Sequence, residues 1–275
     1  MSDASQWATV AWRERQVQVE YQWIAPERAS APLVVFLHEG LGSVAMWKDF
    51  PRQLCEAGGF RGLVFSRPAY GRSTPRGPQE TWGVDFMHQQ AHEVLPAFFE
   101  ALGIAEAPWL FGHSDGASIA LLFAARFPER VRGLVLLAPH ILVEDLTVEN
   151  IERARQAYAI TDLPQKLGRY HDDPDSAFGG WSRIWLDPAF RAWNIEAEIA
   201  AIRAPVLAIQ GLDDEYGTLE QIHGIARRVS GTRLLELPDC AHSPHRDRPE
   251  AVIAQAIAFV AASGAGACAP SRDAT

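Results

Sequence analysis

The segment around Ser114 constrains the fold of this 275-residue chain more than any other. It reads Gly-His-Ser-Asp-Gly over 112–116, directly after the apolar run 108–111 and directly before the apolar-periodic segment 117–127. This order predicts a buried strand, a sharp turn with a serine at its apex, and a helix. Such a turn lifts the serine oxygen above the edge of a sheet, and its two glycines let strand and helix approach where a Cβ would clash.

Strand-like and helix-like segments alternate along most of the chain. After an opening hairpin at 7–12 and 17–24, we expect strands at 33–38, 62–66, 109–112, 134–138, 206–210 and 233–237. Helices are expected at 47–57, 88–102, 117–127, 219–229 and 250–262. Alternation of this kind predicts an α/β fold, with a mostly parallel, eight-stranded sheet flanked by helices.

A serine at such a turn is a weak nucleophile unless a base takes its proton. The order serine, acid, histidine is the one expected on this architecture. The buried run 206–210 is followed by the consecutive acids 213–215, so Asp214 or Asp213 can be the acid. The strand at 232–237 is followed by His242, which we expect to be the base, with His245 as the competing histidine.

With these motifs the chain resembles the α/β-hydrolase superfamily, in particular its capped esterases, enol-lactonases and carbon–carbon bond hydrolases. Segment 33–43 is similar to the family's strand and oxyanion loop, with Glu39 inserted between its histidine and glycine. Segment 67–73 resembles a second family turn, with Ser66 in place of an aspartate. The resemblance implies Ser114 as nucleophile and His242 as base. The family spacing, counted from Gly211, selects Asp214 as the acid.

An attacked carbonyl develops a negative charge that needs preorganised donors. We expect one donor to be the backbone N–H of Asp115, which opens the helix after the serine. The resemblance places the second on the loop after the first parallel strand. Aligned with a lactonase-like Gly-Leu-Gly-Ser pattern, that donor is the amide of Leu41, with Gly40 as the alternative.

The alternation breaks between residues 140 and 202, where helical pieces at 148–159 and 163–170 precede several tryptophans. A structureless loop of this length would be improbable. The resemblance implies a helical cap here, between core segments 1–139 and 203–263, with a flexible tail at 264–275. Trp181, Trp185 and His140 are expected to line a substrate pocket for an apolar or aromatic acyl group. Trp193 is a further candidate for the pocket wall.

These residues predict hydrolysis of a small carboxylic ester or lactone through an acyl-enzyme, with no metal and no cofactor. Carbon–carbon bond hydrolysis of diketo acids can use the same residues. An acyl-CoA thioesterase is another alternative, although segment 141–198 holds 11 acidic and six basic side chains, which disfavours a polyphosphate. A non-catalytic ligand-binding protein on this fold is a more remote one. His88 and His92 lie one helical turn apart, but no third metal ligand accompanies them.

Charge and cysteine content exclude several classes of partner and compartment. The net charge of −9 argues against nucleic acid and anionic membranes as partners, because both favour basic surfaces. The three cysteines lack metal-ligand spacing and indicate a reducing compartment. The first residues lack the features of a signal peptide, and no apolar run is long enough to span a membrane. We therefore expect a cytoplasmic protein with a small-molecule substrate, and the sequence is also compatible with a homodimer.

Overall fold

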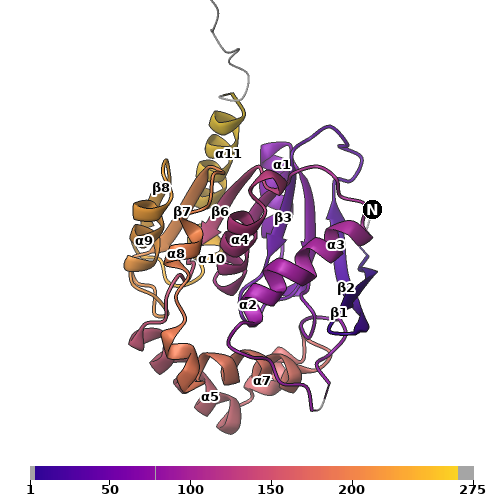
Figure 1. Cartoon of the computed structure of the whole chain (residues 1–275), viewed down its shortest axis with the longest axis vertical. Coiled ribbons are helices and arrows are strands. Elements are labelled where there is room, and N and C mark those ends of the chain that lie inside the picture. Colours follow the sequence, from indigo (N-terminus) through magenta and orange to yellow (C-terminus); the bar gives the residue numbers. More distant parts are fainter. Residues whose placement is uncertain (1–3, 78, 266–275) are drawn as a thin grey trace, which may run out of the picture.

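A single sheet organises the computed structural model, which describes residues 4–77 and 79–265 (Figure 1). Its eight strands lie in the order β1-β2-β4-β3-β5-β6-β7-β8. Their bounds are β1 Gln6–Trp12, β2 Arg15–Ile24, β3 Leu33–Leu37, β4 Arg61–Phe65, β5 Trp109–His113, β6 Gly133–Leu137, β7 Val206–Gly211 and β8 Arg233–Leu237. The pairs from β4 to β8 are parallel, whereas β2 is antiparallel to both β1 and β4. The predicted fold class is confirmed.

The opening hairpin has a tight turn that fits the twist of its strands. Arg13 and Glu14 connect β1 to β2, and both have positive φ values, 51° and 59°. Turns with two such residues match the right-handed twist of a hairpin. The strands then alternate between buried and exposed positions, and Val10 pairs with Val17 on the buried side. The hairpin thus extends the sheet on one edge and keeps its other face in solvent.

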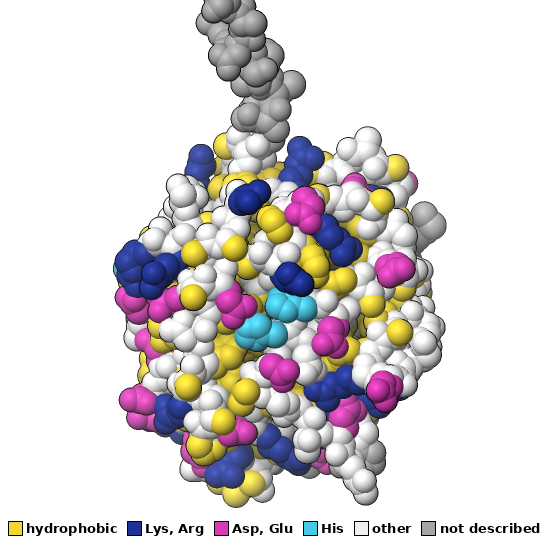
Figure 2. Space-filling view, viewed as in Figure 1, with side chains coloured by type: hydrophobic (Ala, Val, Ile, Leu, Met, Phe, Trp, Pro, Cys, Tyr) yellow, Lys and Arg dark blue, Asp and Glu magenta, His cyan; other side chains and the backbone are white. Residues whose placement is uncertain are grey.

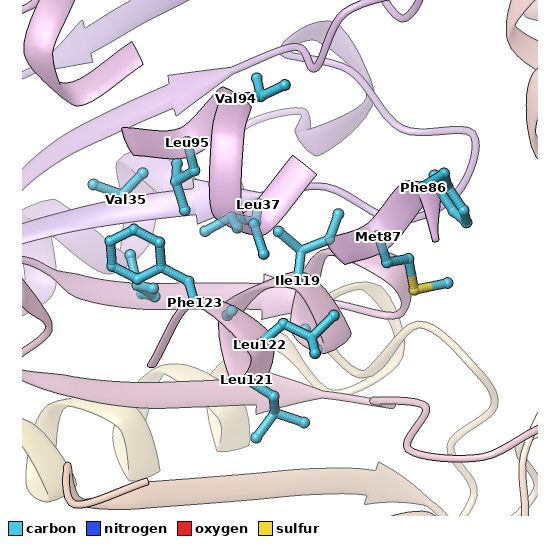
Figure 3. Close-up of a cluster of buried hydrophobic side chains, with 14 of the residues drawn as sticks. Val35, Leu37, Phe86, Met87, Val94, Leu95, Ile119, Leu121, Leu122 and Phe123 are labelled. Atoms are coloured by element: carbon cyan, nitrogen blue, oxygen red, sulfur yellow. The ribbon is translucent and has the colours of Figure 1, made fainter. Parts of the chain in front are cut away.

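Helices cover both faces of the sheet. The helices that flank it are α1 Phe50–Gly58, α2 Phe86–Gln89, the π-helical turn Gln90–Val94, α3 Leu95–Ala101, α4 Asp115–Arg126, α9 Glu220–Arg228, α10 Pro244–Asp247 and α11 Pro249–Ala265. α4 is buried on nearly every side, as expected of a helix that is apolar all round. Figure 3 shows its side chains Ile119, Leu122 and Phe123 beside Leu37 of β3 and Leu95 of α3. A second cluster, on the opposite face, contains Leu54 of α1 and Val252 of α11.

Two expected helices are interrupted in ways that their sequences explain. The helix expected at 47–57 begins only at Phe50, because Lys48 has a φ of 55°, which ends a short 3-10 turn over Ala45–Trp47. The helix expected at 88–102 contains the π turn Gln90–Val94 directly before α3. Pro96 has no N–H to donate to the carbonyl one turn back, and a widened turn accommodates this loss.

The end of the last helix corrects a predicted boundary. A flexible tail was expected from residue 264, but α11 continues to Ala265. Residues 266–275, and with them Cys268, lie outside the described part of the chain. None of the helices in the described ranges is both long and apolar enough to cross a membrane. On the face in Figure 2, acidic and basic side chains are interspersed.

The chain between β6 and β7, residues 138–205, is called here the inserted segment. Its helices are α5 Asp145–Ile160, α6 Leu163–Leu167, α7 Pro174–Trp185 and α8 Glu196–Ile199, with a 3-10 turn over Pro188–Ala192. Figure 1 shows α5 and α7 set apart from the sheet. The two ends of the segment are joined, because the Ile195 N–H donates to the Ile141 carbonyl at 2.8 Å and Leu142 pairs with Asn194 in an antiparallel bridge. This stem lies inside the range 140–202 predicted as a cap.

Candidate active site

Ser114 stands at the apex of a strained turn between β5 and α4. Its φ is 51° and its ψ is −122°, a conformation that side-chain-bearing residues rarely adopt. The neighbouring glycines leave no room for a Cβ: one at position 116 would collide with the backbone oxygen of Leu37, and one at position 112 would lie 2.5 Å from the Cα of Ala117. The close approach that the two glycines were expected to permit is therefore present.

Three side chains from distant parts of the sequence meet at this turn. The Ser114 hydroxyl donates to His242 Nε2 at 2.9 Å, and His242 Nδ1 donates to Asp214 Oδ1 at 2.8 Å. Ser114 follows β5, Asp214 follows β7 and His242 follows β8, so all three lie at the carboxyl ends of parallel strands. The structure brings together the three residues that the sequence selected for nucleophile, acid and base.

The three consecutive acids take different positions. The Asp214 side chain is buried, and it also accepts from the Tyr216 N–H at 2.8 Å and from Gln210 Nε2 at 3.2 Å. Asp213 is exposed, and its backbone N–H donates to the Cys240 carbonyl at 3.0 Å. Glu215 accepts from the backbone N–H of His242 at 3.2 Å. Asp214 alone of the three therefore faces the imidazole.

The electrostatics of this group favour a base with a raised affinity for protons. Burial would lower the pKa of His242, but the charge and hydrogen bond of Asp214 outweigh it and raise that pKa above its ordinary value. Burial would raise the pKa of Asp214, whereas the partnership with His242 lowers it. Asp214 is thus ionised, and it stabilises the positive charge that His242 would gain on taking a proton.

Three backbone N–H groups near Ser114 in the fold, those of Asp115, Gly40 and Leu41, are candidates for an oxyanion site. The Asp115 N–H belongs to the first residue of α4, where no intrahelical acceptor exists. Within residues 4–77 and 79–265, no backbone acceptor pairs with the N–H of Gly40 or with that of Leu41. Both residues line the cavity described below, so the choice between them stays open. Unpaired backbone N–H groups of this kind are the donors that a developing oxyanion would need.

The side chain of Asp115 joins α4 to the inserted segment. Its Oδ1 accepts from Trp185 Nε1 at 3.2 Å, and the residue is almost completely buried. Burial raises the pKa of Asp115 to about 6. Asp115 is not among the residues that line the cavity, and its carboxyl group is engaged with Trp185.

Three further histidines are packed around the site as supports. His38 Nδ1 donates to the Glu39 carbonyl at 2.7 Å and its Nε2 accepts from the Arg67 N–H at 3.0 Å, so its bonds fix a neutral ring. His113 Nε2 donates to the His242 carbonyl at 2.7 Å, and its Nδ1 lies 3.6 Å from Glu39 Oε2. His245 packs on the ring of His113, with 4.8 Å between ring centroids. The structure therefore brings His242, and not the competing His245, to Ser114.

A cavity of about 200 Å³ opens beside Ser114, between the strand ends and the inserted segment. The three residues predicted for the pocket, Trp181, Trp185 and His140, all line it. Trp193 does not; it packs instead on Phe190, with ring centroids 5.3 Å apart, and supports Trp185 from behind. The remaining lining residues are Glu39, Gly40, Leu41, Met46, Ser114, Thr147, Ile151, Leu167, Tyr216 and His242.

Several of these wall residues could not be found from the sequence. Thr147 and Ile151 come from α5, Leu167 from α6 and Met46 from the 3-10 turn before α1. None belongs to a motif, and only the packing of the inserted segment brings them to the site. Tyr216 had a local signal, because it follows the acids 213–215 at a strand end, and its ring lies 4.8 Å from that of His242.

Among the described residues, no group of three or more His, Cys, Asp or Glu side chains is placed to hold a metal ion. His88 and His92 contact each other edge to face, and His88 Nε2 pairs with Glu198 Oε1 at 3.0 Å. This contact links α2 to α8 on the surface, away from the cavity residues.

Comparisons with known proteins identify the family. A model of the alpha/beta hydrolase fold family matches residues 32–185, and the chain belongs to this family. It is 24% identical over 255 residues to a 2-hydroxy-6-oxo-6-phenylhexa-2,4-dienoate hydrolase of Burkholderia cepacia, a match that covers 83% of this chain and 87% of that protein. It is 33% identical over 142 residues to a zearalenone hydrolase of Cladophialophora bantiana, which is 51% of each chain.

A solved structure supports the same fold over nearly the whole chain. The enol-lactonase of Burkholderia xenovorans LB400 superposes with a TM-score of 0.72 and 20% sequence identity. The superposition covers 93% of this chain and 100% of that one. At this identity the likeness concerns the fold.

Proposed function

We propose that the protein is a serine hydrolase that cleaves a small carboxylic ester or lactone through an acyl-enzyme. The observation that carries the proposal is the continuous hydrogen-bonded series from Ser114 Oγ through His242 to Asp214, at distances of 2.9 and 2.8 Å. Distances and order of this kind allow His242 to take the serine proton as the oxygen attacks a carbonyl.

The reaction follows from the positions of these groups. Ser114 attacks the carbonyl carbon, and its proton passes to His242 Nε2. The new oxyanion lies against the Asp115 N–H and the N–H of Leu41 or Gly40. His242, now an imidazolium stabilised by Asp214, gives its proton to the leaving alcohol. Water then enters, His242 removes a proton from it, and the acid product leaves with Ser114 restored.

The cavity supports a small and mostly uncharged acyl group. Its volume of about 200 Å³ is below the usual range for drug-sized ligands, about 300–1,000 Å³. Its wall is largely apolar and aromatic, with Leu41, Met46, Ile151 and the two tryptophans. These properties suit a short or compact acyl chain more than a long one.

A second candidate, carbon–carbon bond hydrolysis, is favoured by the dienoate hydrolase that matches 83% of this chain. A substrate of that kind carries a carboxylate, which a cation usually recognises. The cavity lining, as far as the described residues form it, contains Glu39 but no lysine or arginine. This charge pattern makes the ester or lactone the preferred substrate and leaves the carbon–carbon bond as the alternative to measure beside it.

Covalent labelling and mutation of Ser114 test the proposal. A phosphonate ester should label the wild-type protein at Ser114, because only an activated serine reacts, and short p-nitrophenyl esters should be turned over. Ser114→Ala should lose both properties, while the exposed Ser230→Ala serves as the matched control and should keep them. Wild-type turnover by a folded Ser114→Ala would refute the assignment. Absence of labelling in the wild type would favour a non-catalytic binding protein.

A further inference from the structure

His140 is held in the cavity wall by hydrogen bonds of its backbone, not by hydrogen bonds of its imidazole ring. It follows β6, is only 2% exposed and lines the cavity with Ser114 and His242. Its backbone is held by Ser118, whose hydroxyl donates to the His140 carbonyl at 2.6 Å and accepts from the His140 N–H at 3.1 Å. The ring is therefore positioned by its main chain, and its two nitrogens are free for other partners.

Neither ring nitrogen of His140 forms a hydrogen bond with another described residue. In the part of the chain that the structure describes, no hydrogen bond involves the His140 ring, and its Nδ1 is completely buried. The ring contacts Trp185 edge to face at 4.9 Å and lies 5.7 Å from the ring of His242. Burial, with repulsion from His242, lowers the pKa of His140 to about 3, so the ring is neutral at physiological pH. A neutral imidazole offers one donor and one acceptor.

Trp181 provides a second unused donor on the same cavity. Its indole N–H packs against Gly40, where a Cβ would collide with it. Over residues 4–77 and 79–265 no acceptor pairs with that N–H, whereas the N–H of Trp185 is taken by Asp115. A buried polar group without a partner costs free energy, so the buried Nδ1 of His140, beside the unpaired N–H of Trp181, points to a ligand group that binds at this wall of the cavity.

The surrounding charges restrict what this ligand group can be. Glu39 is the acidic residue of the wall, and the described lining residues include no cation. A carboxylate or phosphate would therefore lack a counter-charge next to Glu39. A neutral oxygen, in contrast, can accept from an N–H of His140 or Trp181, and a hydroxyl can also donate to the free nitrogen of His140.

We propose that the substrate's acyl group carries a hydroxyl or keto oxygen near the reacting carbonyl, and that His140 binds this oxygen and selects such substrates over hydrocarbon acyl groups. The proposal rests on the proposed function, because it places the acyl group in the cavity beside Ser114. His242 contacts Ser114 at 2.9 Å, and its ring is 5.7 Å from that of His140. This spacing fits an oxygen on carbon 2 or 3 of the acyl chain.

The test compares acyl groups that differ only in a hydroxyl or a methyl group. The probes are p-nitrophenyl esters of 2-hydroxy- and 3-hydroxybutanoic acid and of their isosteres, 2-methyl- and 3-methylbutanoic acid. We expect kcat/KM for the hydroxy ester to exceed that for its isostere about tenfold or more at one of the two positions, because a site that hydrogen-bonds a substrate hydroxyl rejects the analogue lacking it. In His140→Phe that ratio should fall to about one or below.

Two further variants separate this role from a packing role. His140→Asn keeps a polar group and should retain part of the preference, which a purely structural role would not predict. His223→Phe is the matched control, since His223 lies on α9 and pairs with Glu236 of β8. It should keep the full wild-type ratio.

Each outcome decides the proposal. Turnover of all esters without preference for the oxygen, or a preference that survives in His140→Phe, would overturn the role of His140 and leave the proposed hydrolase function standing. If the wild type neither hydrolyses the esters nor is labelled at Ser114, the proposed function fails instead. Calorimetric binding of the same ester pairs to Ser114→Ala then decides the inference: tighter binding of the hydroxy ester supports it, and equal binding overturns it.

Discussion

In the variant Asp214→Asn, the amide nitrogen can take the position of either Oδ1 or Oδ2, and the hydrogen bonds of Asp214 indicate which orientation is more stable. The Oδ1 position accepts from both His242 Nδ1 and the Tyr216 N–H, whereas among the described residues only Gln210 Nε2 donates to the Oδ2 position. An amide nitrogen at Oδ1 would oppose the Tyr216 N–H and require His242 to carry its proton on the wrong nitrogen. At Oδ2 it would oppose only Gln210, whose Nε2 already donates to the Gly217 carbonyl at 2.8 Å. We therefore expect the second orientation.

The two orientations differ in their kinetic cost. With the wrong imidazole tautomer, an aspartate-to-asparagine change in such a triad costs about 10⁴ in kcat. With the correct tautomer, Asp214→Asn loses only the charge that stabilises the imidazolium. For charges about 4 Å apart at an effective dielectric constant of about 20, that attraction is about 4 kcal/mol, or about 10³ in rate. Because a neutral hydrogen bond remains, we expect Asp214→Asn to lose about 10²- to 10³-fold.

The assay is kcat on the best ester, with Asp213→Asn as the matched control. Asp213 is exposed and its backbone N–H, not its carboxylate, donates to Cys240, so its variant should stay within about twofold of wild type. The ¹⁵N shifts of His242 report the tautomer directly. A larger loss in Asp213→Asn than in Asp214→Asn would refute the assignment of the acid. A loss of about 10⁴ with a deprotonated Nδ1 would refute the orientation argument.

Two further predictions concern pH and the serine turn. Asp214 raises the pKa of His242, and only the neutral imidazole accepts the serine proton, so kcat/KM should fall as the pH drops through a value above 6.5. The midpoint of this fall should move to lower pH in Asp214→Asn. A wild-type midpoint below 6.5 would contradict the prediction. Gly116→Ala puts a methyl group into the backbone oxygen of Leu37, so urea unfolding should show a loss of about 3 kcal/mol or more. Gly77→Ala, with its nearest atom 3.6 Å away, should change stability by less than about 0.5 kcal/mol, and similar losses in both would discount the clash.

The parts of the site that sequence reasoning located are those fixed by local backbone geometry. Gly112 and Gly116 predict the tight turn around Ser114, because such a turn has no room for a Cβ and glycine is the residue that lacks one. His242 follows a strand and precedes a helix, so its position at the sheet edge follows from the alternation of elements. Counting from Gly211 selected Asp214, and the structure places this carboxylate 2.8 Å from His242 Nδ1, because the strand end fixes which of the consecutive acids faces inward.

The remaining features depend on contacts between segments far apart in the sequence. The bond from Trp185 to Asp115 joins residues 70 positions apart, and no pattern in either helix indicates it. Thr147 and Leu167 reach the cavity only because the helices of the inserted segment fold back over the strand ends. The sequence also does not decide whether Gly40 or Leu41 supplies the second oxyanion donor. The two residues are adjacent on one loop, and predicted strand boundaries are not accurate to a single residue.

The stem of the inserted segment has a consequence for how this protein can be altered. The backbones of Ile141 and Ile195 are hydrogen-bonded, and Leu142 pairs with Asn194 in a β-bridge. Residues 143–193 therefore form one long loop whose two ends meet at this junction. Closing a longer loop at a fixed junction is cheap, about 0.6 kcal/mol per doubling of its length. Helices from another family member could therefore be grafted at this junction while β6 and β7 keep their register. The fold thus combines a sheet that fixes the positions of Ser114, Asp214 and His242 with a segment that can be exchanged and that supplies part of the cavity wall.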